Sequence, residues 1–286
     1  MSNSLTSERF CFSVDTLSLI RNHVGSTFVI KYGGSAMKSK SLQLNVMHDI
    51  AFLYLLGIKI ILVHGGGYLI DNWLIKLNIK PRFEKGLRVT DANTMEVAEM
   101  VLSGYVNKNL ISLLNQNDIP AIGLSGKDAN LVTAVPLSND FNNFTGNIHN
   151  VNVKVLRTFL DNNFLPVVAS IASDLKGQTY NINADTLAGS IASYIKADKL
   201  ILLTDTPGIL YNINDNSSLI KHMNLDQICD LKSKGVITDG MIPKVDCCID
   251  ALNNQVSAAH IIDGRMRYAL LHELLTNDKF GSTLVL

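Results

Sequence analysis

Short apolar runs alternate with segments of helical spacing along most of the chain. Residues 27–32 (TFVIKY) and 59–64 (KIILVH) are continuous apolar runs, and segments with helical spacing follow them at residues 41–56 and 68–78. Such a run is typical of a strand buried on both faces, and strand–helix alternation is the signature of βαβ units. The pattern predicts an α/β fold with three αβα layers around an open, mainly parallel sheet.

The alternation continues toward the C-terminus. The other expected strands lie within PAIGL (120–124), LPVVASIA (165–172), DKLILLTD (198–205) and AAHIIDG (258–264). The other expected helices are residues 93–116, 153–163, 184–197, 224–234, 241–254 and 268–277. Residues 131–150 predict a β-rich excursion with turns. Residues 8–24 have apolar positions at three-to-four spacing, which predicts an amphipathic helix ahead of the first strand.

The length of the chain and its lack of linkers indicate one compact unit with two lobes. The chain has 286 residues, of which 47% are hydrophobic, so it can bury a large core as one domain. No fixed-period repeat or low-complexity linker divides it. The polar segment 174–181 is the best lobe boundary. We therefore expect an N-terminal extension over 1–26, an N-lobe over 27–175 and a C-lobe over 176–286.

Charge and composition argue against several classes of partner. The formal net charge is +0, so the basic field that binds nucleic acid or an anionic membrane is lacking. No apolar run reaches the ~20 residues of a membrane span, and residues 1–26 lack the apolar core of a secretory signal. The cysteines have no paired spacing and predict neither a zinc site nor a disulfide framework. They are Cys11, Cys229, Cys247 and Cys248.

Two of the expected strands end in glycine turns. Gly33 and Gly34 follow the first strand, and three consecutive glycines, 65–67, follow the second. In an open parallel sheet, ligands bind beyond the carboxyl ends of the strands, where glycine turns expose backbone N–H groups to anions. Both turns are therefore expected to face one crevice. Lys31 could reach a phosphate there, although a strand-ending lysine is more often a solvated surface residue.

The common nucleotide and esterase fingerprints do not fit these turns. HGGGYL lacks the G-x-G-x-x-G spacing of dinucleotide folds, and GLSGKD (123–128) lacks both the P-loop spacing and its Ser or Thr. HGGG also occurs in the oxyanion loop of esterases, but the chain has no G-x-S-x-G elbow to supply a nucleophile. A nucleotide site here would belong to another fold.

Three further stretches carry candidate binding groups. Arg88, in GLRVT (86–90), is expected in a short loop, where its planar fork suits a carboxylate and a surface ion pair is the alternative. NINAD (181–185) precedes a helix, so Asp185 could serve a ligand or a cap. In ITDGMIPKV (237–245), Lys244 could project from the start of a helix toward the same phosphate as Lys31.

Six motifs in order carry a family resemblance. IKYGGS, VHGGG, GLRVT, NINAD, LLTDTPGIL and ITDGMIPKV together resemble the N-acetyl-L-glutamate kinases of the amino acid kinase family, from about residue 26 to the C-terminus. GLRVT with NINAD points to these kinases rather than to the aspartate, carbamate or uridylate kinases. The resemblance implies the amino acid kinase fold and ATP-dependent phosphorylation of the γ-carboxylate of N-acetylglutamate, in arginine biosynthesis.

The resemblance also assigns roles to residues. Lys31 and Lys244 match the lysines that stabilise the transition state, and Asp185 matches the carboxylate that orients them. The implied substrate-binding residues are Gly66, Gly67, Arg88 and Asn181. The implied nucleotide-binding residues are Gly33, Gly34, Thr204, Asp205 and Gly208. Mg²⁺ is expected to arrive with ATP, because the sequence offers no dedicated metal site, and no tightly bound cofactor is expected.

Both ends of the chain resemble regulatory parts of arginine-inhibited members. In those members the N-terminal helices interlace dimers into a hexamer. AHIIDGR and LLHELL match their effector region, with His260 and Glu273 as candidates to contact arginine; Gly281–Ser282 replaces the usual Gly-Thr. Some members from photosynthetic lineages also bind a trimeric nitrogen-status signalling protein. The resemblance therefore implies arginine inhibition and a homohexamer, in a plastid if plastid-encoded and otherwise in the cytoplasm.

Two other functions remain open from the sequence. One is an amino acid kinase with a different acceptor. The other is a catalytically silent regulator that binds nucleotide or arginine, although such a protein would have no need of Lys31, Asp185 and Lys244 together.

Overall fold

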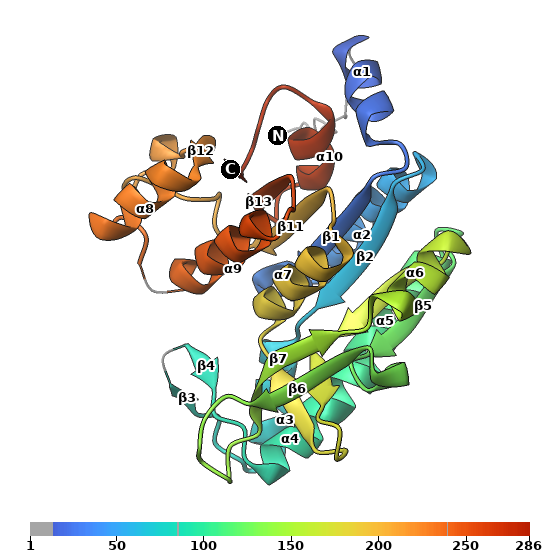
Figure 1. The fold of residues 1–286 in the computed structure, drawn as a ribbon, viewed down its shortest axis with the longest axis vertical. Helices are drawn as coiled ribbons and strands as arrows, with labels where there is room; N and C mark the ends of the chain where they lie inside the picture. Colours follow the sequence, from blue (N-terminus) through green and yellow to red (C-terminus); the bar gives the residue numbers. More distant parts are fainter. Residues whose placement is uncertain (1–13, 85, 239) are drawn as a thin grey trace, which may run out of the picture.

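One long sheet organises the computed structural model, which describes residues 14–84, 86–238 and 240–286 (Figure 1). Its neighbouring strands are all parallel except β13 and β14. In spatial order they are β12 (His222–Asn224), β14 (Ser282–Val285), β13 (Ala258–Asp263), β11 (Lys199–Thr204), β1 (Thr27–Tyr32), β2 (Lys59–His64), β8 (Leu165–Ala169) and β5 (Ala121–Ser125). The predicted α/β fold with a mainly parallel sheet is confirmed.

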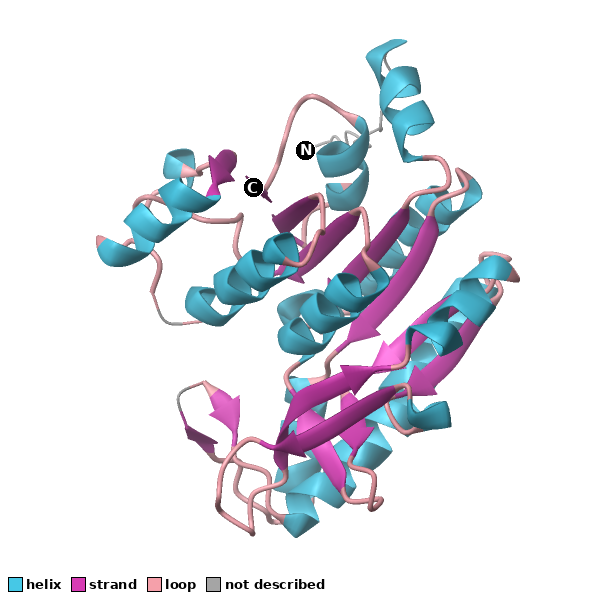
Figure 2. Ribbon diagram, in the orientation of Figure 1, coloured by secondary structure: helices cyan, strands magenta, loops and turns pink. Residues whose placement is uncertain are grey.

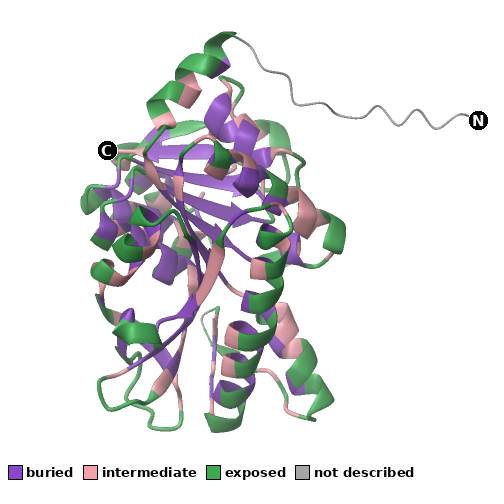
Figure 3. Ribbon diagram, turned by 90° about the vertical axis from the view of Figure 1, so that its right-hand side faces the viewer, coloured by how far each residue is buried: buried purple, intermediate pink, exposed green. Residues whose placement is uncertain are grey.

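Helices cover both faces of this sheet (Figure 2). Along β1, Phe28 and Ile30 pack into one apolar core and Val29 into the other, because successive side chains of a strand point to opposite faces. The first core holds α2 (Lys40–Leu55), α3 (Gly67–Lys76), α4 (Ala92–Glu99), α5 (Asn107–Asn115) and α10 (Ala269–Leu275). The second holds α6 (Val153–Asp161), α7 (Ala184–Ile195), α8 (Leu225–Ser233) and α9 (Met241–Asn253). The buried strands therefore run between helices whose outer faces are exposed (Figure 3).

A smaller set of strands forms the half of the molecule around α3 and α4. Four strands close on one another: β6 (Val132–Pro136), β7 (Thr145–Val151), β9 (Ile171–Ser173) and β10 (Thr179–Ile182). The predicted β-rich excursion forms β6 and β7. A short hairpin, β3 (Phe83–Glu84) and β4 (Leu87–Arg88), lies beside them. Arg88 therefore ends a strand, and the prediction of a short loop there was wrong.

The predicted helix over 93–116 exists but changes its winding. A π-helical segment, η2 (Met100–Val106), joins α4 to α5. The described residues also form three short 3₁₀ turns: η1 (Gly34–Met37), η3 (Asp128–Asn130) and η4 (Asn216–Ser218). A π-helical turn holds one more residue than an α-helical turn, so it shifts the face that the rest of the helix presents.

Helix α1 (Val14–His23) is the described part of the predicted N-terminal helix. It packs against α10, where His23 Nε2 lies 3.2 Å from the carbonyl oxygen of Leu274. The rest of that prediction, with Cys11, lies outside the described residues. None of the described helices is long and apolar enough to cross a membrane.

Candidate active site

The two predicted glycine turns meet at one edge of the sheet. β1 and β2 are parallel neighbours, and the Gly65 N–H donates a hydrogen bond of 3.0 Å to the carbonyl of Tyr32. Gly34 has a φ of +67°, which favours glycine. A Cβ atom on Gly33 would lie 3.2 Å from the ammonium of Lys31, so glycine leaves space for that side chain. Both turns therefore contribute to the surroundings of Lys31.

Two lysines converge on a single buried aspartate. Lys31 Nζ lies 3.0 Å from Asp185 Oδ1 as an ion pair, and Lys244 Nζ donates a hydrogen bond of 2.7 Å to Oδ2. Asn183, not Asp185, caps helix α7, because its side chain accepts from the backbone N–H groups of Asp185 and Thr186. The capping alternative for Asp185 is thereby answered, and its carboxylate is left to hold the lysines.

The charges at this cluster favour an ionised carboxylate. Burial alone would raise the pKa of Asp185, but the ammonium groups of Lys31 and Lys244 outweigh burial and lower the pKa to about 2. Two cations on one anion leave a net positive charge beside the glycine turns. Such a fixed charge can stabilise a transferring phosphoryl group.

A pocket of about 190 Å³ on one side of this cluster holds all four predicted substrate residues. Gly66, Gly67, Arg88 and Asn181 line it. Arg88 is 8% exposed, and its guanidinium donates to Asp71 (2.6 Å) and to the carbonyl of Gly67 (3.1 Å). The guanidinium is therefore held at the wall of the pocket in a fixed direction, as recognition of a carboxylate requires.

A second pocket, of about 250 Å³, lies on the other side of the cluster. Thr204, Asp205 and Gly208, the residues predicted for the nucleotide, line it together with Lys244. Lys244 therefore belongs both to this pocket and to the ion-pair cluster. Asn183 and Ala184, just before Asp185, line the first pocket. The lysine–aspartate cluster thus lies between the two pockets, whereas Gly33 and Gly34 stay beside Lys31 and line neither.

The two effector candidates form a separate buried pair. His260 Nδ1 lies 2.8 Å from Glu273 Oε1, and Lys199 Nζ lies 3.3 Å from His260 Nε2. Glu273 Oε2 also accepts from the backbone N–H groups of Phe280 and Gly281. Burial lowers the pKa of His260, so this imidazole is neutral near pH 7 and donates through Nδ1. The pair links β13 to α10 and to the chain just before β14.

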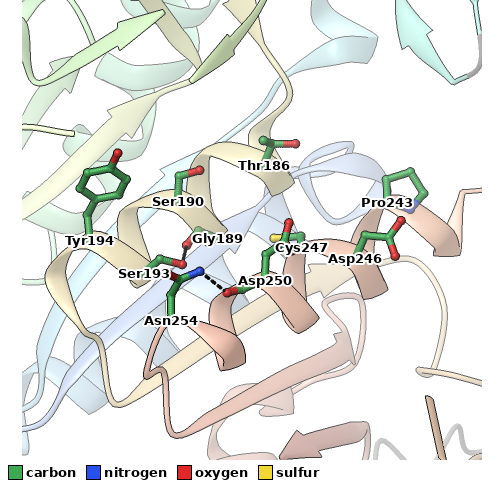
Figure 4. Close-up of a pocket in the computed structure, with 10 residues that line it drawn as sticks. All are labelled: Thr186, Gly189, Ser190, Ser193, Tyr194, Pro243, Asp246, Cys247, Asp250 and Asn254. Carbon is green, nitrogen blue, oxygen red and sulfur yellow. Dashed lines mark hydrogen bonds between the residues drawn. The ribbon is translucent and has the colours of Figure 1, made fainter. Parts of the chain in front are cut away.

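Sequence reasoning missed two features near the cluster. A cavity of about 560 Å³ opens between α7 and α9, with Cys247 on its wall (Figure 4). The Cys247 thiol donates to the backbone carbonyl of Asp185 at 2.9 Å, which ties α9 to α7. Asp71, the partner of Arg88, was also missed, because the pattern of α3 does not distinguish it from a surface residue.

Comparison with known proteins shows the family of this chain. The model of the amino acid kinase family matches residues 26–263. This chain belongs to the amino acid kinase family. It is 54% identical over 280 residues to an acetylglutamate kinase of Gracilaria tenuistipitata var. liui, with 98% of each chain covered. It is 50% identical to an acetylglutamate kinase of Nostoc punctiforme, with 95% of this chain and 91% of that one covered.

A solved structure shares the fold. The N-acetylglutamate synthase of Neisseria gonorrhoeae, complexed with coenzyme A and N-acetyl-glutamate, superposes with a TM-score of 0.84 at 24% identity. The match covers 95% of this chain and 62% of that longer one, and at this identity it supports the fold alone. The family resemblance, the fold and the predicted class of enzyme, a kinase, are confirmed.

Proposed function

We propose that this protein transfers the γ-phosphoryl group of ATP to the γ-carboxylate of N-acetyl-L-glutamate, in arginine biosynthesis. The observation that carries the proposal is the Lys31–Asp185–Lys244 cluster, placed between a pocket that holds Arg88 and a pocket at the end of β11. The acetylglutamate kinases of Gracilaria and Nostoc, at 54% and 50% identity, support this choice of acceptor.

The reaction needs positive charge rather than a general base. The acceptor carboxylate is already ionised at pH 7, so no proton has to be removed before attack. A carboxylate oxygen bonds to the γ-phosphorus, and the bond from that phosphorus to the oxygen shared with the β-phosphate breaks. ADP leaves with the electron pair, and the product is an acyl phosphate. The main obstacle is repulsion between two anions, which Lys31 and Lys244 would reduce.

The remaining residues would bind and orient the two substrates. Arg88, fixed by Asp71, would hold the α-carboxylate of N-acetylglutamate, while Gly66, Gly67 and Asn181 complete its pocket. Gly33 and Gly34 would offer N–H groups to the phosphates, and Thr204, Asp205 and Gly208 would surround the nucleotide. Mg²⁺ would arrive in the ATP complex and neutralise phosphate charge. Among the described residues, no group of three or more metal-ligating side chains is available to hold it separately.

Arginine inhibition is the regulatory part of the proposal. The buried Glu273 carboxylate, held by His260 and by two backbone N–H groups, could accept the guanidinium of arginine in exchange for some of these contacts. Helix α1 packs on α10, the helix that carries Glu273, so this region and the N-terminal helix form one structural unit. A homohexamer, binding of a nitrogen-status signalling protein and a plastid location belong to the same proposal and rest on the family resemblance.

The function is tested by trapping the acyl phosphate as its hydroxamate, with ATP and a panel of acceptors. N-acetylglutamate should be the preferred acceptor, ahead of aspartate, glutamate and carbamate. Preference for another acceptor would assign a different reaction of the same family. ATP binding without any acyl phosphate would favour the silent regulator.

Arginine inhibition is tested by titrating arginine in the same assay with wild type and Glu273→Gln. We expect wild type to be inhibited, and Glu273→Gln to need ~10-fold more arginine, as for the loss of one charge-assisted contact. Arginine should also raise the Tm of wild type, which requires no variant. Wild-type activity indifferent to arginine, with an unchanged Tm, would contradict this part of the proposal.

A further inference from the structure

A buried histidine stands directly before the glycine triplet and has no role in the proposed chemistry. His64 ends β2 and is 0% exposed. Its Nδ1 lies 3.0 Å from the carbonyl oxygen of Gly65, and its Nε2 lies 3.1 Å from the side-chain nitrogen of Asn107, the first residue of α5. Both ring nitrogens therefore have defined partners.

These partners fix a single tautomer of the imidazole. A carbonyl oxygen only accepts hydrogen bonds, so the proton has to be on Nδ1. Asn107 Nδ2 also lies 2.9 Å from the carbonyl oxygen of Val167, which assigns this atom as the amide nitrogen and a donor to Nε2. Burial lowers the pKa of His64 to about 4, so the ring is neutral near pH 7.

The hydrogen bond from Nδ1 orients the peptide unit between Gly65 and Gly66. In a planar trans peptide the C=O and the following N–H point in opposite directions. Because the Gly65 carbonyl is turned toward His64, the Gly66 N–H is turned away from it. Gly66 lines the pocket that also holds Arg88, and its N–H has no acceptor among the described residues. A ligand in that pocket can therefore accept from this N–H.

The π-helical segment builds the support for this arrangement. Leu102 and Val106 of η2 press against Gly66, where a Cβ atom would lie 2.9 Å and 3.1 Å from their side chains. On β5, a Cβ atom at Gly123 would lie only 2.0 Å from the amide oxygen of Asn107. Glycine at both positions lets η2 and the start of α5 pack closely enough for Asn107 to reach His64. The π-helical segment thus ends directly before Asn107, the residue whose side chain contacts the imidazole.

We propose that His64 and Asn107 are positioning residues, which hold the Gly65–Gly66 peptide so that the Gly66 N–H points at the oxygen atoms of the reaction centre. This inference rests on the proposed function for the identity of those atoms. Neither residue touches substrate; both act through the backbone of the glycine triplet. A donor aimed in advance needs no reorganisation during the reaction, which is why its direction affects rate.

Two amide replacements of His64 separate donation from the Nδ1 position from simple packing of the side chain. The amide nitrogen of His64→Asn falls near the position of Nδ1 and can still donate to Gly65, whereas that of His64→Gln falls near Nε2 and cannot. We expect His64→Gln to lower kcat ~10²-fold, as for the loss of one oriented donor, with the KM for ATP changed little. His64→Asn should recover most of that loss. Equal kcat values for the two variants would overturn the inference.

Asn107 is tested by Asn107→Ala, with Asn109→Ala, an exposed asparagine two residues farther along α5, as the matched control. Removing the donor to Nε2 lets the ring turn, so we expect a kcat loss of ~10-fold for Asn107→Ala, smaller than that of His64→Gln. Asn109→Ala should keep wild-type kcat. A normal kcat in folded Asn107→Ala would contradict the assigned role.

A spectroscopic measurement on wild type keeps the inference testable if these variants fail to fold. Nitrogen-15 NMR of the imidazole distinguishes a proton on Nδ1 from one on Nε2. We expect the neutral Nδ1–H form of His64 from pH 6 to pH 8, and a proton on Nε2 or a charged ring would overturn the inference. This result does not depend on activity. Wild type that forms no acyl phosphate would refute the proposed function. The spectrum would still show whether His64 donates from Nδ1 to the Gly65 carbonyl.

Discussion

The pKa values of two buried aspartates, Asp49 and Asp185, are shifted in opposite directions. Asp185 is 7% exposed and Asp49, on α2, is 3% exposed. Burial raises the pKa of Asp49 to about 7, and its one backbone donor, the N–H of Leu270 at 3.2 Å, offsets only part of that rise. At Asp185 two ammonium groups reverse the effect of burial and bring the pKa to about 2. Similar burial is therefore accompanied by opposite pKa shifts, and the neighbouring cations decide the direction of the shift.

The comparison shows where the fold concentrates positive charge. Among the described residues, Asp49 has no cationic partner within ion-pair distance. No charge interaction therefore offsets the burial of its carboxyl group. Asp185 instead keeps Lys31 and Lys244 together at the ends of two elements, between two pockets. The arrangement at Asp185 fits a site that binds and stabilises anions, while that at Asp49 fits a structural contact between α2 and α10.

Removing one lysine makes the surroundings of Asp185 more like those of Asp49, and it has the largest expected effect. Lys31→Ala or Lys244→Ala should each lower kcat ~10²-fold or more, as for the deletion of one transition-state donor. The measurement is steady-state hydroxamate formation with saturating ATP and N-acetylglutamate. Turnover close to wild type in either variant would remove that lysine from the mechanism.

A matched control for these variants is Lys232→Ala. Lys232 pairs with Asp246 on the surface, so its removal deletes a lysine ion pair outside the cluster. It should leave kcat unchanged and alter stability by less than about 1 kcal/mol. A loss of turnover similar to that of Lys31→Ala would indicate a general effect of charge.

Arg88 sharpens the comparison, because its carboxylate partner Asp71 is partly exposed and the guanidinium also faces a pocket. Arg88→Ala should raise the KM for N-acetylglutamate by ~10- to 100-fold, since a charge-assisted contact contributes about 1.5–3 kcal/mol. The KM for ATP should change little. Unchanged kinetics for N-acetylglutamate would count against the assigned binding of the α-carboxylate.

Asp49 gives the smallest expected effect, on stability rather than activity. Its pKa is raised from 3.8 to about 7, so its stabilising contribution is complete below pH 4 and is lost as pH rises through 7. Between pH 6 and pH 8, wild type should lose about 1 kcal/mol that Asp49→Asn does not lose. Urea unfolding at the two pH values measures this difference.

The matched variant for this measurement is Asp185→Asn. Because the pKa of Asp185 is about 2, its carboxylate is ionised in the folded and the unfolded chain throughout pH 6–8. Asp185→Asn should therefore keep the pH dependence of wild type, whatever its absolute stability. Parallel pH dependence of wild type and Asp49→Asn would contradict the raised pKa of Asp49.

The central strands and the glycine turns could be predicted because their signal is local. β1 and β2 are apolar runs long enough to identify, and parallel strands bring the turns that follow them to one edge. The hairpin that carries Arg88 has strands of two residues, and β12 has three, so neither shows a period. Strands this short are set by tertiary contacts rather than by their own sequence.

The support around the site was beyond local sequence signals. The π-helical segment η2 has ordinary helical spacing, and it packs through Leu102 and Val106 against Gly66, which lies far from it in the sequence. In the sequence, Asp49 is an ordinary polar position of a helix. Its contact is the backbone N–H of Leu270, which lies 221 residues later in the chain and donates to its carboxylate. The motifs therefore indicated which residues could react, and the packing determined how they are held and charged.

The central claim is that a carboxylate oxygen of N-acetylglutamate attacks the γ-phosphorus of ATP. It is tested most directly with N-acetylglutamate labelled with ¹⁸O in its γ-carboxylate, followed by cleavage of the product with hydroxylamine. Attack by the carboxylate predicts inorganic phosphate that carries one ¹⁸O atom, because hydroxylamine cleaves the bond between carbon and the bridging oxygen. Phosphate without ¹⁸O, released while ATP is consumed, would contradict the claim.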